Sequence, residues 1–138
     1  MYPQGNEILV VAHQPNRRER ITQFLADEGF AVTAAAEGLA ALRAFGDRQF
    51  GLVVAAVDLP GSLDGLATVR RARRRQPGLR ALYTGEPASR PLLANPATED
   101  FIAAPFERRE LIGCVFELLH RAAMDEAADL GRRIRAEI

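Results

Sequence analysis

The stretch GLVVAAVDLPGSLDG, residues 51–65, decides the fold prediction. Its first part is an apolar, β-branched run, which is too short for a helix and typical of a strand buried on both faces. The PGSLDG that follows has the composition of a turn, and a helical pattern begins after it. The strand ends in Ala55 and Ala56. A parallel α/β sheet usually has its catalytic and ligand-binding residues at the carboxyl ends of the strands. The alanines at this strand end have no side chain that could serve either purpose.

Strand and helix patterns alternate along the whole chain. Strands are predicted at residues 7–11, 30–34, 52–57, 79–83 and 101–103, and helices at 16–28, 37–46, 65–75 and from 108 onward. Between residues 84 and 101, Pro87, Pro91 and Pro96 allow at most a short helix. This order predicts a doubly wound, flavodoxin-like (βα)5 fold with five parallel strands, an irregular fourth helix and a long last helix.

The amino-acid composition excludes several classes of partner and of chemistry. The 138 residues contain 18 basic and 18 acidic side chains, so no global field attracts nucleic acid or an anionic membrane. All the basic residues are arginine, which removes the lysine nucleophile from the possible chemistry. The single cysteine, Cys114, cannot form an internal disulfide, and no apolar run is long enough for a membrane span. We therefore expect a cytoplasmic protein without a membrane or nucleic-acid partner.

Four stretches resemble the receiver domain of two-component response regulators. They are ILVVAHQPNRR, VVAAVDLPGSLDGL, LYTG and FIAAPF, and together they extend the resemblance over about residues 6–120. The resemblance implies aspartyl phosphorylation supported by one magnesium ion. The family uses an acidic pair after the first strand, an aspartate after the third, a hydroxyl after the fourth and a lysine after the fifth.

At the corresponding positions of this chain, the acidic and lysine side chains of the family are replaced. The acidic pair falls on Ala12 and His13, the acceptor on Ala56 and the lysine on Ala104, while Thr84 retains the hydroxyl. A methyl group has no lone pair to attack phosphorus, and magnesium needs hard oxygen ligands. We therefore predict a degenerate phosphorylation pocket without catalytic residues, metal or cofactor, and a protein that is not an enzyme.

Other polar residues near these strand ends leave alternatives open. Asp58 is either a turn residue or a displaced acceptor, and Asp64 is expected to cap the next helix. His13 is either a loop residue or a titrating ligand. Thr84 is expected to hydrogen-bond the backbone locally, beside Phe101 at the position of the family's switch aromatic.

Two further features concern surfaces. The run VRRARRRQPG places five arginines at the end of the third helix, which suits the helix dipole, an acidic partner or nucleic acid. The last helical pattern continues through residues 123–138 as an apolar stripe that either forms a dimer or partner contact or packs back on the domain. The candidate interaction residues are Phe106, Leu130, Ile134 and Ile138.

The sequence thus predicts a receiver-like domain at 1–122 and a helical extension at 123–138. We expect a stand-alone, phosphorylation-independent pseudo-receiver that binds a signalling protein and forms a homodimer through strands four and five and the last helix. The alternatives are a true phospho-receiver that uses Asp58, and a flavodoxin-like module that binds a small molecule or nucleotide beside His13 and Thr84.

Overall fold

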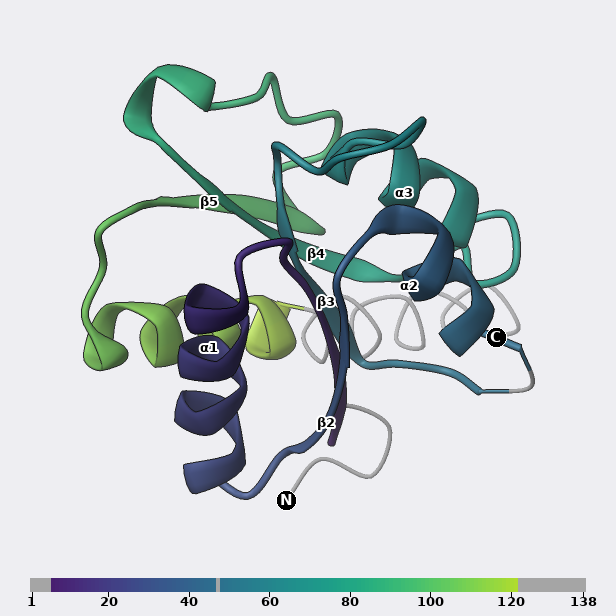
Figure 1. The fold of residues 1–138 in the computed structure, drawn as a ribbon. Helices are drawn as coiled ribbons and strands as arrows, with labels where there is room; N and C mark the ends of the chain where they lie inside the picture. The colour runs from purple at the N-terminus through teal and green to yellow at the C-terminus, as the bar shows by residue number, and fades with distance from the viewer. Residues whose placement is uncertain (1–5, 47, 122–138) are drawn as a thin grey trace, which may run out of the picture.

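A five-stranded parallel sheet forms the centre of the computed structural model, which describes residues 6–46 and 48–121 (Figure 1). The strand order is β2-β1-β3-β4-β5, and every neighbouring pair is parallel. The strands are β1 (Glu7–Val11), β2 (Ala31–Ala35), β3 (Leu52–Ala56), β4 (Arg80–Gly85) and β5 (Glu99–Ala103). This topology confirms the predicted flavodoxin-like fold.

Helices cover both faces of this sheet. They are α1 (Pro15–Asp27), α2 (Gly38–Ala44), α3 (Gly65–Ala72), the short 3-10 helix η1 (Pro87–Ser89) and a last helix whose described part is residues 108–121. Between η1 and β5 the chain is irregular, as the three prolines predicted. Within the described residues, no helix has the length and apolar character that a bilayer crossing needs.

The alternation of side chains along the strands divides the core into two layers. Ile8 and Val10 of β1 face the side where α1 and the last helix contribute Leu25 and Leu111. The intervening Leu9 and Val11 face α2 and α3. All five residues of β3 are buried, because this strand lies at the centre with helices on both sides. The continuous apolar run in the sequence reflects this double burial.

Local signals set the helix boundaries. Pro15 starts α1, one residue before the predicted start, and proline is favoured in the first turn because its missing N–H needs no partner there. Gly29 follows this helix with a φ of 93°, a backbone conformation that residues other than glycine rarely adopt. Asp64 caps α3 by accepting the Ala67 N–H at 2.8 Å, as predicted.

The residues predicted for the interaction surface are only partly described by the structure. Phe106 is not a surface residue, because its side chain packs in the layer with Leu111 and Val115 and is only 9% exposed. The turn after β5 directs it inward beneath the last helix. The other candidates, Leu130, Ile134 and Ile138, lie outside the described residues, as does the extension at 123–138.

Candidate functional site

A hollow of about 400 Å³ opens at the carboxyl ends of β1, β3 and β4. Because these strands are parallel neighbours, their ends meet at one edge of the sheet. Five of the six residues predicted for the degenerate pocket line it: Ala12, His13, Ala56, Asp58 and Thr84. Ala104 lines a neighbouring hollow of about 240 Å³ instead, together with Pro105 and Phe106.

Methyl groups form the floor of the pocket. Ala12 and Ala56 are buried, at 1% and 8% exposed, and the methyl side chain of alanine offers no polar atom to a ligand. The start of α3 lies directly against this floor, because a Cβ on Gly65 would collide with the Ala56 carbonyl oxygen. Only glycine permits this close approach, which fixes the third strand end and the following helix relative to each other.

The carboxylates at the rim already have partners in the fold. The exposed Asp58 accepts a hydrogen bond from the Ser89 hydroxyl at 3.2 Å, and this contact links the loop after β3 to η1. Asp64 is occupied as the cap of α3. Glu86 lines the same hollow. The rim therefore has negative charge, but the acids are distributed over two loops, with Asp58 and Asp64 between β3 and α3 and Glu86 after β4.

These residues do not fit the magnesium ion that the receiver resemblance implies. Magnesium is usually held by one or two carboxylates together with water and phosphate. Ala12 and Ala56 supply no oxygen from their side chains, and the described part of the chain contains no cluster of three His, Cys, Asp or Glu side chains that could hold a metal. The donor set therefore disagrees with the metal chemistry that the resemblance implies.

The hydrogen bonding of the Thr84 hydroxyl differs from what the sequence predicts. Thr84 is fully buried, and its Oγ1 has no hydrogen-bond partner among the described residues, so the expected local bond to the backbone is wrong. The carbonyl of Thr84 is in use, since it accepts the Val57 N–H at 2.8 Å. Phe101 is also buried, and the Arg90 guanidinium lies 4.8 Å from the centre of its ring.

Two arginines that sequence reasoning missed lie in the first turns of α1, which follows β1. Arg18 Nη1 donates hydrogen bonds to the carbonyl oxygens of Ala12 at 2.9 Å and His13 at 3.1 Å. Arg17 lines both hollows. Positive charge is unfavourable at the start of a helix, so arginines in the first turn of α1 are a signal that another contact uses them.

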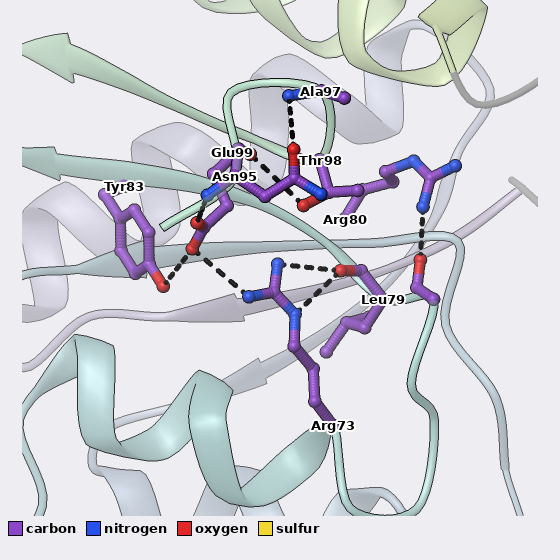
Figure 2. Close-up of polar contacts among 9 residues, drawn as sticks. Arg73, Leu79, Arg80, Tyr83, Asn95, Ala97, Thr98 and Glu99 are labelled. Atoms are coloured by element: carbon purple, nitrogen blue, oxygen red, sulfur yellow. Dashed lines mark hydrogen bonds and ion pairs between the residues drawn. The ribbon is translucent and has the colours of Figure 1, made fainter. Parts of the chain in front are cut away.

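A buried polar network joins the end of α3 and strands β4 and β5 to the segment that follows η1 (Figure 2). Glu99, the first residue of β5, is 4% exposed. Its Oε2 accepts hydrogen bonds from the Tyr83 hydroxyl at 3.1 Å and from Arg73 Nη1 at 3.2 Å, and its Oε1 accepts the Asn95 N–H at 2.9 Å. Arg73 also donates to the Leu79 carbonyl oxygen through Nε and Nη2. One carboxylate thus connects α3, β4, β5 and residue 95.

Burial and charge together set the ionisation of this network. Burial opposes the ionised form of Glu99, but the Asn95 N–H, Arg73 and Tyr83 outweigh burial and hold the pKa of this carboxyl below its ordinary value of 4.5. Burial and the neighbouring Glu99 charge raise the pKa of Tyr83 far above its ordinary value. At neutral pH the network therefore contains an ionised Glu99 paired with Arg73.

Comparisons with known proteins identify the family. The family model "Response regulator receiver domain" matches residues 8–116. The chain belongs to this family. Two receiver relatives are "Transcriptional activator protein PfeR" of Pseudomonas aeruginosa, 32% identical over 128 residues, and "Transcriptional regulatory protein TctD" of Salmonella typhimurium, 34% identical over 115 residues. These matches cover 91% and 80% of this chain, but only 42% and 51% of the relatives, so the chain spans about half their length or less.

Solved receiver structures have the same fold. NtrX from Brucella abortus, in complex with ADP, superposes with a TM-score of 0.78 at 29% identity, over 91% of this chain and 30% of that protein. The response regulator protein TrrA from Thermotoga maritima, in complex with Mg(2+)-BeF, superposes with a TM-score of 0.72 at 27% identity, over 82% of this chain and 98% of that one.

The pH dependence of stability tests the Glu99 network. Because the pKa of Glu99 is lower in the folded state, its contribution is present above the unfolded pKa, near 4.5, and is lost as the pH falls through the lower folded value. Urea titrations should show that Glu99→Gln lowers the free energy of unfolding at pH 7 and that the difference from the wild type shrinks below pH 4.5. Glu117→Gln, at an exposed position, is the control and should show no such change. A difference that stays constant with pH would contradict the assignment.

A substitution at Thr84 tests whether its hydroxyl lacks a partner. Replacing a buried, unsatisfied hydroxyl with a methyl group of similar shape should stabilise the fold by about 1 kcal/mol. Thermal and urea unfolding of Thr84→Val should therefore show a more stable protein. The matched control is Thr68→Val, which removes a hydroxyl that donates to the Asp64 carbonyl oxygen at 2.7 Å and should destabilise. A Thr84→Val protein less stable than the wild type would refute the assignment.

Proposed function

We propose that this chain is a pseudo-receiver, a receiver domain that works by binding another protein and does not depend on aspartyl phosphorylation. The observation that carries the proposal is the methyl floor of the pocket, where Ala12 and Ala56 occupy the ends of β1 and β3. Receiver chemistry needs a carboxylate nucleophile at the end of the third strand, and an alanine cannot form an acyl phosphate.

Charge stabilisation is also missing from the pocket. Phosphoryl transfer depends mainly on positive groups that neutralise the transferred phosphoryl oxygens. The chain contains no lysine, and the position after β5 where the family resemblance places one is Ala104. The described pocket lining includes three carboxylates, those of Asp58, Asp64 and Glu86, against a single arginine, Arg17. This balance disfavours a phosphorylated state.

Asp58 is the rival acceptor, and the geometry argues against it. Its carboxylate is exposed and accepts a hydrogen bond from Ser89, outside the methyl floor. The positions of the family's acidic pair are Ala12 and His13, and Asp64 is engaged as the cap of α3, so a magnesium ion beside Asp58 would lack the acidic pair that the receiver resemblance implies. We therefore assign Asp58 the role of joining the loop after β3 to η1.

The relatives supply the signalling context of the proposal. PfeR and TctD are named as transcriptional regulators, and this chain matches only part of each. Whether the whole protein acts alone, as the sequence predicted, stays a prediction. We propose that this domain is cytoplasmic and receives or relays a signal through contact with another signalling protein.

The surface we propose for this contact is formed by β5, the segment between η1 and β5, and the last helix. Leu92 in this segment is 95% exposed, and it is one of two large apolar side chains exposed among the described residues. The segment is held in place by Glu99 at residue 95 and by Arg121, which donates to the Pro96 carbonyl oxygen at 3.0 Å. A fixed, exposed apolar side chain suits a protein contact, and we propose that a second copy of the chain also binds here.

A second candidate function follows from the unpartnered Thr84 hydroxyl. It belongs to a hollow of about 400 Å³ that is large enough for a small molecule, and buried hydroxyls without a partner are rare in folded proteins. Under this alternative, the fully buried Thr84 Oγ1 would be reached by a polar ligand only when the edge of the hollow opens, and the two would then form a hydrogen bond. Such a ligand would raise the thermal stability of the wild type and not that of Thr84→Val.

Incubation with acetyl phosphate and magnesium tests the proposed function. Intact-mass spectrometry should show an unchanged protein, because no side chain in the pocket combines a nucleophile with charge stabilisation. A receiver with a complete acidic pair and acceptor, treated in parallel, is the positive control for the reagent. A stable phosphoryl adduct that disappears in Asp58→Ala would replace the proposal with a displaced phosphorylation site.

A further inference from the structure

Five exposed arginines gather at the ends of α2 and α3. Arg43 lies in the last turn of α2, and Arg70 and Arg71 lie in the last turn of α3. Arg74 and Arg75 follow in a turn that continues the helical hydrogen bonds, with Arg74 N–H donating to the Arg71 carbonyl oxygen at 3.1 Å. All five side chains are exposed. We call them the arginine face.

These arginines differ from others that the fold uses. Arg48, Arg108 and Arg121 are partly exposed, and each forms an ion pair with an acidic side chain. Across residues 6–46 and 48–121, by contrast, no acidic side chain pairs with any member of the arginine face. The chain has a formal net charge of zero, so the excess of positive charge here is local.

Fold stability does not account for the number of charges. Positive charge is favourable at the end of a helix, but like charges one helical turn apart repel each other. Arg70 and Arg74 have that spacing, and so do Arg71 and Arg75. Arg73, in the middle of the same run, is the member that the fold uses, because it turns inward to Glu99 and the Leu79 carbonyl oxygen. Its neighbours are thereby held on a rigid turn facing solvent.

The neighbouring helix adds an apolar element to the face. Helices α2 and α3 lie side by side on the same side of the sheet (Figure 1). Both follow strands of one parallel sheet, so they run in the same direction and end at the same edge. Leu39 is 44% exposed and lies one turn before Arg43 on α2. The surface therefore combines a row of arginines with an exposed leucine.

We propose that the arginine face binds an acidic amphipathic segment of a partner protein. Carboxylates of such a segment would pair with Arg70, Arg71, Arg74 and Arg75, and an apolar side chain would contact Leu39. Arginine is suited to this contact because its planar guanidinium binds carboxylates through two hydrogen bonds. The exposed Leu39 matches an apolar side chain of a protein segment, and the chain as a whole has no net positive charge to attract nucleic acid, so a protein segment fits better than nucleic acid.

This proposal does not rest on the phosphorylation-independent function, because the arginine face lies at the opposite edge of the sheet from the methyl-floored pocket. Fluorescence anisotropy on the full chain can test it with a synthetic amphipathic peptide rich in glutamate and leucine, and with a DNA duplex as the second probe. The peptide should bind, and raised salt should weaken the binding because the contacts are ionic. Arg71→Gln combined with Arg75→Gln should weaken it by about tenfold or more.

Matched variants separate local from global charge effects. Arg20→Gln combined with Arg109→Gln removes the same charge from exposed positions elsewhere and should leave peptide binding nearly unchanged. Arg71→Lys combined with Arg75→Lys keeps the charge but loses the paired hydrogen bonds of the guanidinium, so its binding should lie between that of the wild type and that of the Gln variant. Circular dichroism should show that all variants are folded. No peptide binding by the wild type, equal loss in the two Gln variants, or tighter binding of the duplex than of the peptide would each overturn the proposal.

Discussion

Parallel pairing brings the carboxyl ends of all five strands to one edge of the sheet, and this constraint determines what the protein can do. In such a sheet the residue at each strand end decides the chemistry of the edge. Here β1 is followed by Ala12, β3 ends at Ala56 and β5 is followed by Ala104. The backbone of a receiver domain is preserved, while the strand ends present methyl groups. Gly65 packs closely on the Ala56 carbonyl and positions the start of α3 against this edge.

Polar and charged side chains elsewhere in the fold have mainly structural contacts. Arg18 binds the backbone at the end of β1, Asp64 caps α3, and Arg73 pairs with the buried Glu99. The Glu99 network is important because a buried carboxylate without partners would cost several kcal/mol, roughly as much as a large core truncation. Since Glu99 is ionised at neutral pH, the segment between η1 and β5 is held in one position without any phosphorylation event. This network is the physical basis on which we propose a protein-binding surface that does not depend on phosphorylation.

Much of the fold and the composition of the pocket could be predicted from the sequence. The buried strand at β3 is a continuous apolar run, and parallel order alone brings Ala12, Ala56 and Thr84 together. Side-chain directions could not be predicted in the same way. Nothing in the residue pattern indicates that the Thr84 hydroxyl lacks a partner or that the Phe106 side chain packs in the core. The predicted strand at 101–103 omits Glu99 and Asp100, which begin β5 in the structure, and a buried glutamate is recognisable only once Arg73 and Tyr83 are placed beside it.

The most direct measurement of the central claim is a titration of the chain with magnesium and beryllofluoride, which mimics a phosphoryl group, while backbone amide chemical shifts are recorded. TrrA, a receiver with a solved Mg(2+)-BeF complex, is the positive control. The amide signals of the residues at the ends of β1, β3 and β4 should not move in this chain. Saturable shifts centred on Ala12, Ala56 and Asp58 would show that the pocket holds the cation and the phosphoryl mimic, and would contradict the pseudo-receiver account.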